Sequence, residues 1–304
     1  MKKKVFLFGL LFSLLLLCGC GVNLTSTVKL NKDFLGTRVM SCTFSSRDFH
    51  SYFKGSKEDL NKLIKESCPD ALTYTSSSSD GNDTYTFYLR FSSLDDYKKK
   101  VRDLLNFSPE ITYEYGDSPF VSGLIYKENF TSKDLMTWLY TALYEGKYID
   151  KDSSSDLWDL KSTEISFLGT TYETKDKINI DEMAYVPLSS IHIDTKTKKS
   201  GKLARVIEFD LPQQTLDQNA GKIRSYFAGN DITWENTSDG KTLCISFDAN
   251  NFSDLAQKTR TVLHSKNSFG TYSSTCSKDN PFTLKINYEE SLDLSHFIQK
   301  NQKI

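Results

Sequence analysis

Apolar and polar residues alternate along several short stretches of the chain and recur at helical spacing along others. Residues 85–91 alternate as in a half-buried strand, and residues 94–105 carry their apolar side chains on one face of a helix. The second half repeats this succession, with a strand pattern at residues 242–247 and a helix pattern at residues 252–263. Mixed strand and helix signals of this kind predict an α+β fold.

Each half also opens with a pattern typical of a β-hairpin, at residues 22–44 and 190–209. A helix is expected after each hairpin. The first begins at residues 56–59, which resemble a capping box, and the second covers residues 215–227. A short strand and an Asp-Gly turn then lead into the strand and helix described above. The order of predicted elements is therefore the same in both halves.

A sequence motif supports this division. Residues 117–128 and 279–290 share the pattern D-x-P-F-x5-Y-x-E without a gap. We therefore expect two similar units, each an antiparallel sheet of the opening hairpin plus further strands, covered by two helices. In that arrangement Phe91 corresponds to Phe247 and Phe120 to Phe282, all as buried positions.

The predicted boundaries follow from the repeat and from the polar stretch at residues 150–156. We expect residues 1–19 to be a leader that is removed and residues 20–130 to form the first α+β unit. A helix, a polar linker and short strands occupy residues 131–187, and residues 188–304 form the second α+β unit.

The first residues have the pattern of an export signal. A basic cluster, Lys2, Lys3 and Lys4, precedes an uncharged apolar run over residues 5–17. This run is too short to cross a bilayer, which takes about twenty apolar residues. The basic cluster followed by a short apolar run is typical of a signal peptide.

The run ends in Leu17-Cys18-Gly19-Cys20, which resembles the lipobox of bacterial lipoproteins. Leu17 and Gly19 match the positions that the signal peptidase recognises. The resemblance implies that Cys20 receives diacylglycerol on its sulfur and that cleavage falls between Gly19 and Cys20. The protein would then lie on the extracytoplasmic face of the bacterial cell membrane, held by its lipid. The alternative is an ordinary secreted protein in which the two cysteines are accidental.

Net charge and cysteine spacing limit the kinds of partner and metal that the sequence predicts. The formal net charge of −1 gives no field that would select nucleic acid. Besides Cys18 and Cys20 the chain has Cys42, Cys68, Cys244 and Cys276, whose spacing matches no zinc site. Whether these four form disulfides stays open, since buried free thiols on strands are the alternative. We expect no metal and no other cofactor.

Catalytic motifs are absent from the sequence. The four histidines form no H-E-x-x-H pattern, and there is no G-x-S-x-G elbow, phosphate-binding loop or cysteine-protease signature. We therefore expect a protein that is not an enzyme. The alternative is an envelope-acting hydrolase whose site is assembled only by the fold.

Two further features are candidates for function. Glu128 and Glu290, each two residues after a motif tyrosine, recur in the two halves. The alternative, which the pattern favours, is that Pro-Phe and Tyr pack at a strand start while the Glu faces solvent. The predicted hairpin tips are the second feature, because apolar or basic tips can touch a bilayer surface. A packed or solvated turn is the alternative. The tip residues are Phe34 and Leu35 in the first hairpin and Lys196, Lys198, Lys199 and Lys202 in the second.

Almost no spacer separates Cys20 from the hairpin at residues 22–44. In this the chain is similar to LppM-type bacterial lipoproteins, small α+β ectodomains of largely unassigned function. The resemblance covers residues 17–130 and, through the repeat, residues 190–298. It implies a membrane-proximal module that handles lipid or envelope material, and it supplies no catalytic residues.

These observations predict a lipid-anchored extracytoplasmic binding or envelope-associated protein. Membrane lipid is its first partner, through Cys20. Its further partner is expected to be a lipid, a wall component or another membrane protein.

Overall fold

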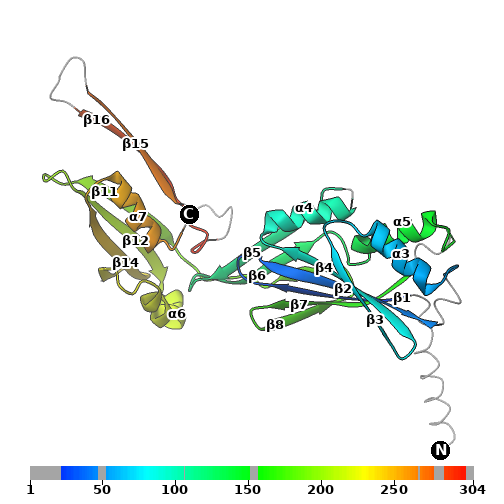
Figure 1. Cartoon of the computed structure of the whole chain (residues 1–304). Coiled ribbons are helices and arrows are strands. Elements are labelled where there is room, and N and C mark those ends of the chain that lie inside the picture. Colours follow the sequence, from blue (N-terminus) through cyan, green and yellow to red (C-terminus); the bar gives the residue numbers. More distant parts are fainter. Residues whose placement is uncertain are drawn as a thin grey trace, which may run out of the picture. The chain divides into compact units, whose positions relative to one another are not determined.

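The computed structural model shows a mixed α+β protein built mainly from antiparallel sheets (Figure 1). It describes residues 22–46, 53–105, 107–150, 157–265, 268–276 and 284–298. For residues 269, 272–276 and 284–287 only the backbone is described. The predicted α+β class is therefore confirmed.

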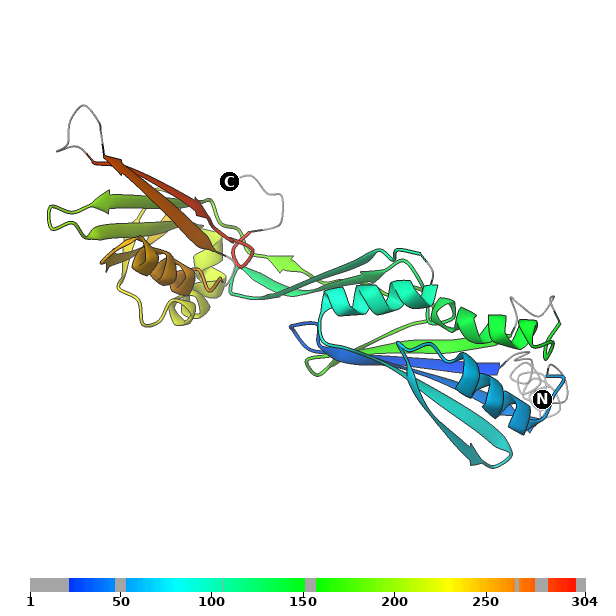
Figure 2. The same ribbon diagram turned by 45° about the horizontal axis from the view of Figure 1, so that its top comes forward.

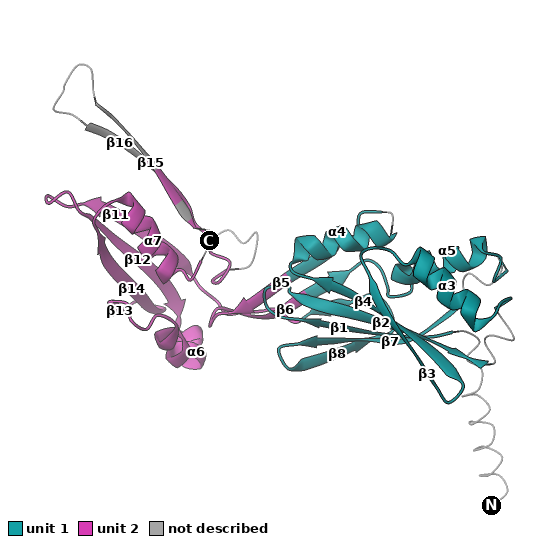
Figure 3. Cartoon of the chain, in the orientation of Figure 1, with its two compact units in different colours: residues 1–113, 126–181 teal, residues 114–125, 182–304 magenta. Residues whose placement is uncertain are grey.

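The chain divides into two compact units (Figure 3). Unit 1 comprises residues 1–113 and 126–181, and unit 2 comprises residues 114–125 and 182–304. The hairpin of strands β5 (Ile111–Asp117) and β6 (Val121–Glu128) contributes to both units, because its turn belongs to unit 2. These limits differ from the sequence-based boundaries, which left residues 131–187 as a separate segment.

Unit 1 is organised around a six-stranded sheet with the order β3-β4-β2-β1-β7-β8. In Figures 1 and 2 its helices lie over one face of this sheet. The strands are β1 (Val22–Leu30), β2 (Gly36–Ser45), β3 (Thr73–Ser79), β4 (Asn82–Phe91), β7 (Trp158–Phe167) and β8 (Thr170–Thr174), with the short strand β9 (Asn179–Asp181) paired to β6. The helices are α3 (Lys57–Ser67), α4 (Leu94–Leu105), the 3-10 turn η1 (Asp134–Met136) and α5 (Thr137–Glu145).

Strand β7 changes the predicted picture of unit 1. It pairs in parallel with β1, with Val22 opposite Trp158 and Leu30 opposite Phe167, apart from one register shift. Residues expected to form short strands in a connector therefore extend the first sheet. The prediction of a purely antiparallel sheet is therefore wrong for unit 1.

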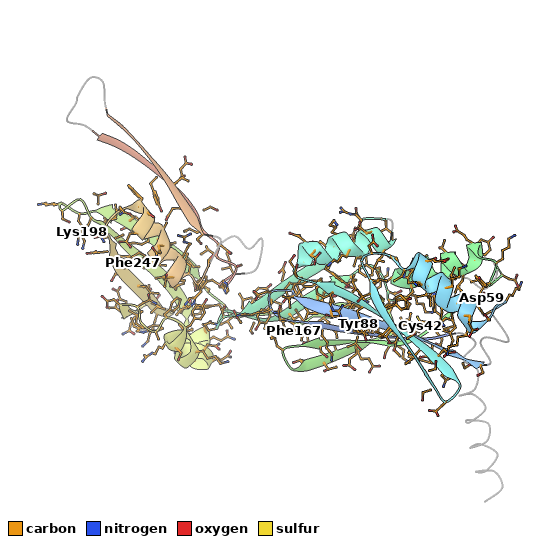
Figure 4. The ribbon with its side chains drawn as sticks, in the orientation of Figure 1. Cys42, Asp59, Tyr88, Phe167, Lys198 and Phe247 are labelled. Carbon is orange, nitrogen blue, oxygen red and sulfur yellow. The ribbon has the colours of Figure 1, made fainter. Side chains whose placement is uncertain are left out.

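Alternation of buried and exposed side chains explains why these segments are strands. In β1 the side chains at every second position, from Val22 to Leu30, face the interior. The inward positions of β2 and β4 continue the same face, and most are apolar. Cys42, labelled in Figure 4, lies among them and is completely buried. Burial raises the pKa of its thiol.

The predicted capping box is present at the start of α3. The Ser56 hydroxyl accepts the Asp59 backbone N–H, and the Asp59 carboxylate accepts the Ser56 backbone N–H. These hydrogen bonds lower the pKa of the Asp59 carboxyl. Leu60 and Ile64 then face the interior, which places α3 on the sheet.

Unit 2 is organised around a four-stranded antiparallel sheet with the order β11-β12-β14-β13. Helices α6 and α7 pack on β12 and β14. The elements are β10 (Ala184–Tyr185), β11 (Ser190–Thr197), β12 (Leu203–Pro212), α6 (Gln213–Tyr226), β13 (Ile232–Asn236), β14 (Gly240–Ala249), α7 (Phe252–Val262) and the hairpin of β15 (Phe269–Cys276) and β16 (Leu284–Ser291).

The predicted equivalence of Phe91 and Phe247 as buried positions is wrong. Phe91 pairs with Gly36 and is buried, whereas Phe247 pairs with Arg205 and is only partly buried. Phe91 is the last residue of β4, whereas Phe247 lies before the last residue of β14, Ala249, so the two phenylalanines take different places in their strands. Phe120 is fully buried in the core of unit 2, against Phe209 and Phe297, and Phe282 lies outside the described residues.

Candidate functional site

A pocket of about 640 Å³ lies on unit 1 between α3, α4 and the η1–α5 segment. Its volume is in the range of small-molecule binding sites, roughly 300–1,000 Å³. It is lined by Leu63, Ser67, Leu104, Leu105, Phe107, Asp134, Thr137, Trp138, Thr141, Ala142, Glu145 and Gly146. The pocket is the strongest candidate for a binding site in the part of the chain that the structure describes.

Helices α3 and α4 bring their C-terminal turns to this pocket, and α5 borders it from its first residue to its last. Ser67 is the last residue of α3, Leu105 the last of α4, and Glu145 the last of α5. Along α5 the lining residues recur every three or four positions, so one face of this helix borders the pocket. The pocket is therefore built by the ends of α3 and α4 and by one face of α5, with Phe107 and Gly146 following directly after α4 and α5.

The pocket wall is partly apolar. Trp138 meets Phe87 of the sheet edge to face, with ring centroids 5.4 Å apart. Its indole N–H is buried and has no hydrogen-bond partner among the described residues. Phe107 is 49% exposed, which is unusual for a large apolar side chain. An apolar ligand in this pocket would cover side chains that water now contacts.

The ionisable side chains of the lining are all acidic. Asp134 accepts hydrogen bonds from the backbone N–H and the hydroxyl of Thr131, at 2.7 and 3.0 Å, so its carboxylate is held in place. Glu145 is exposed. None of the described residues that line the pocket is basic.

Helices α3 and α5, which line part of the pocket, lie toward the end of unit 1 where β1 begins (Figures 1 and 2). Beyond α5 the chain returns to this end, where the backbone N–H of Val22 donates to Leu157. The backbone N–H of Lys54, before α3, donates to Tyr148, after α5, at 2.6 Å. The start of β1 thus lies beside Leu157, and the segment before α3 lies beside the segment that follows α5.

A second polar site in unit 1 is completely enclosed. Arg38 of β2 donates to Glu128 of β6 at 2.7 Å, and both side chains are buried, with 1% and 0% exposed. The same arginine donates to the Tyr97 hydroxyl at 2.7 Å and to Ser132 at 2.9 Å. Tyr97 and Tyr126 both donate to the other oxygen of Glu128. We name these residues the Arg38 network.

Burial raises the pKa of both tyrosines in the Arg38 network, and the neighbouring charge of Glu128 adds to this effect. Burial by itself would lower the pKa of Arg38, but the attraction of Glu128 outweighs it and raises that pKa. These shifts keep Arg38 charged and the two tyrosines neutral at neutral pH. It joins the six-stranded sheet to the β5–β6 hairpin.

Unit 2 contains a related pair. Arg205 of β12 donates with two nitrogens to the two oxygens of Glu290 of β16, each at 2.7 Å. Arg205 also donates to Thr259 of α7 at 2.7 Å and to Thr195 of β11. The Tyr288 hydroxyl donates to Glu290. We name these residues the Arg205 network.

Both motif glutamates therefore accept from an inward-facing arginine, and the view that they face solvent is wrong. The sequence analysis missed both arginines. An arginine at an inward position of an otherwise apolar strand was the available signal, because a buried charge needs a partner.

The hairpin tips differ from each other. Phe34 is buried, with 1% exposed, and packs on Phe91, Tyr97, Tyr113 and Tyr126. It is therefore not available to a membrane surface, a correction to the predicted contact. Leu35 is 54% exposed. The tip follows the far end of β1, roughly 30 Å from Val22 at about 3.3 Å per residue.

The lysine tip of unit 2 is exposed. Lys196 pairs with Asp194 at 2.7 Å, and Lys198, at the tip in Figure 4, pairs with Asp248 at 2.6 Å. Lys199 and Lys202 are exposed as well. The two ion pairs reduce the charge that this tip can present to anionic lipid.

The remaining predicted residues concern cysteines and the anchor. Cys42, Cys68 and Cys244 are free thiols, and the side chain of Cys276 is not described. Over the described residues, no group of three or more His, Cys, Asp or Glu side chains is placed to hold a metal ion.

The predicted signal-peptide and anchor residues lie outside the described residues; they are Lys2, Lys3, Lys4, Leu17, Gly19 and Cys20. Of the helices that are described, none has the length and apolarity to cross a bilayer.

Comparison with known proteins gives no family. No protein-family model matches the chain, and no curated protein matches it significantly.

Proposed function

We propose that this chain is a lipid-anchored, extracytoplasmic binding protein without catalysis, and that its site is the helical pocket of unit 1. The observation that carries the proposal is the pocket of about 640 Å³, with an apolar wall and an exposed Phe107. Such a combination suits an amphiphilic ligand, whose apolar part covers the wall while its polar part meets the acidic rim. The ligand comes from the lipid or cell-envelope material nearby.

The position of the pocket supports a ligand from the membrane. Val22, the first residue of β1, is two positions after Cys20, a span of at most about 7 Å. A lipid on Cys20 would hold this end of unit 1 at the headgroups. Helices α3 and α5 of the pocket wall lie toward the same end (Figure 1). An amphiphile leaving the bilayer surface would then have a short path to the site.

Native mass spectrometry tests the binding proposal. The mature chain with Cys20→Ser, exported in its own host and purified without detergent, should carry a co-purifying lipid-like molecule. Ala142→Trp fills the pocket and should remove it. Tyr144→Trp places the same indole at an exposed position of the same helix that does not line the pocket, and the ligand should stay bound. A ligand retained equally by both variants would place the site elsewhere, and absence of any ligand would count against the function.

The anchor has a separate test. Cys20→Ala should abolish labelling of the protein by radioactive palmitate and release it from the membrane fraction. Cys18→Ala should leave both unchanged. The reverse pattern would show that the lipid is attached to Cys18 and not to Cys20.

We further propose that the two units are copies of one α+β unit of two hairpins, two helices and a closing hairpin. Strand order supports this proposal. In unit 1 the strands lie in the order β3-β4-β2-β1, and in unit 2 the strands in the same places along the chain lie in the order β13-β14-β12-β11. In each unit an arginine of the second strand pairs with the motif glutamate.

The α4 and α7 helices support the same proposal. Asp96 accepts the backbone N–H of Ser92 and pairs with Lys100. Asp254 accepts that of Asn250 and pairs with Lys258. With Leu89 matched to Phe247, both segments align without an insertion. An experimental structure in which the two units superpose on these residues would establish the repeat, and a different strand order would end the proposal.

A further inference from the structure

We infer that the occupant of the helical pocket is a cationic amphiphile, an apolar chain or ring joined to an ammonium group. This inference rests on the proposed function and specifies its ligand. It follows from three properties of the pocket that point to the same chemistry.

The first property is the sign of the side-chain charges. Asp134 and Glu145 line the pocket, and none of its described lining residues is basic. Asp134 is already held by two hydrogen bonds from Thr131 on the pocket's edge. A carboxylate fixed in this way needs no rearrangement to meet a cation. An anionic headgroup would instead meet two like charges without a compensating one.

The second property is the orientation of the helices. The C-terminal turns of α3 and α4 border the pocket, whereas α5 borders it along its whole length. Each helix carries a partial negative charge of roughly half an electron at its C-terminal end. Lys65 and Arg102 lie in the last turns of α3 and α4 but do not line the pocket, and α5 has no basic residue in its last turn. Helix dipoles and carboxylates therefore act in the same direction.

The third property is the aromatic wall. Trp138 and Phe107 line the same pocket as the two carboxylates. Aromatic rings attract ammonium groups through their faces, and tryptophan does so best. The apolar positions Leu63, Leu104 and Leu105 offer contact for a hydrocarbon chain. A bare metal ion would gain nothing from this part of the wall.

Unit 2 shows that this charge pattern is not general in the molecule. A smaller pocket of about 200 Å³ beside α6 is lined by Arg224, Lys241 and Asp217, among others. There Arg224 already covers the ring of Trp234, at 5.5 Å from its centroid. In the unit 1 pocket the aromatic side chains lie beside acidic groups, and none of the described lining residues is a lysine, arginine or histidine.

Calorimetric titration with three soluble probes of equal chain length tests the inference. Decyltrimethylammonium, decanol and decanoate are added, below their micelle concentrations, to the mature Cys20→Ser chain freed of bound ligand. We expect decyltrimethylammonium to bind at least about ten-fold more tightly than decanoate, with decanol between them. The preference should shrink as salt is added, because the rim charges are exposed to solvent.

Charge variants locate the effect. Glu145→Gln should weaken binding of decyltrimethylammonium about two- to five-fold and leave decanol unchanged. Asp134→Asn in the same chain should weaken it further, while asparagine still accepts from Thr131. Glu173→Gln is the matched control, because Glu173 is exposed on β8 of the same unit and does not line the pocket. It should change none of the three affinities.

The outcomes separate the two levels of the proposal. Equal affinity for all three probes, or tighter binding of decanoate, would overturn the cationic ligand and leave the binding function standing. Failure of every probe to bind, together with no co-purifying ligand in mass spectrometry, would overturn both. Tighter binding of a lysine-rich peptide than of decyltrimethylammonium would replace the amphiphile by a protein partner.

Discussion

The Arg38 and Arg205 networks place the same ion pair in two different environments. In unit 1 Arg38 and Glu128 are sealed from solvent, and in unit 2 Glu290 keeps 15% of its side chain exposed. The second nitrogen of Arg38 donates to Ser132, which is hydrogen-bonded at 3.0 Å to Thr163 of β7. In the Arg205 network the corresponding partner is Thr195 of the adjacent strand.

The difference shows what the extra strand of unit 1 does. Ser132, before η1, accepts from the second terminal nitrogen of Arg38, and Thr163 of β7 is hydrogen-bonded to Ser132. A pair closed in this way is costly to break, since removing one partner leaves the other charge buried and unpaired. A partly exposed pair can exchange its partner for water. The two networks should therefore respond differently to the same substitutions.

Removal of the glutamate should give the largest effect. Glu128→Ala leaves Arg38 buried without its counter-charge and should lower the free energy of unfolding by about 3–5 kcal/mol. Glu290→Ala should cost about 1–3 kcal/mol, because water can reach Arg205. Urea unfolding of the full chain measures both. Tryptophan fluorescence follows Glu128→Ala in a Trp234→Phe background, which keeps only Trp138 and Trp158 of unit 1. It follows Glu290→Ala through Trp234 in a background with Trp138→Phe and Trp158→Phe. Equal losses would show that burial does not distinguish the networks.

Removal of one tyrosine hydroxyl should give an intermediate effect. Tyr126→Phe deletes a hydrogen bond to a fully buried carboxylate and should cost about 1.5–3 kcal/mol. Tyr288→Phe deletes the related bond in unit 2, where solvent can replace it, and should cost about 0.5–1.5 kcal/mol. The same unfolding experiment applies. A larger loss for Tyr288→Phe would reverse the comparison.

Alkaline pH should weaken unit 1 through its buried tyrosines. Burial raises the pKa of Tyr85 to about 12, and it raises those of Tyr97 and Tyr126 as well. An unfolded tyrosine ionises near pH 10, so stability is full below that pH and falls above it. For Tyr85 the loss should fall between about pH 10 and pH 12. Thermal unfolding against pH should show a shallower decline in Tyr85→Phe, and an unchanged decline would contradict this assignment.

The smallest effect should be equal in both units. Hydrogen bonds from Ser92 and Asn250, together with the neighbouring lysines, lower the pKa values of Asp96 and Asp254. Their contribution to stability is present above the unfolded pKa near 3.9 and disappears as pH falls through the lower folded value. Asp96→Asn and Asp254→Asn should give small, similar losses at pH 7 that vanish in acid. A loss confined to one unit would count against the repeat.

Much of the fold could be predicted from the sequence because local signals agreed with one another. The helix at residues 94–105 and the capping box at Ser56 occur where the pattern predicted. Both opening hairpins have the predicted strands. Each signal depends on residues close in the chain, such as a cap, an Asp-Gly turn or an apolar face. The repeated motif marked Glu128 and Glu290 by the same local reasoning.

The partners of those glutamates were decided only by the tertiary structure. Arg38 and Glu128 are ninety positions apart, and no local pattern relates them. The parallel pairing of β7 with β1, the burial of Phe34 and the pocket between three helices likewise join segments distant in the chain. Local sequence determines which face of an element is apolar. Which distant element covers that face, and whether a charge there is sealed or reaches water, depends on the packing of the whole unit.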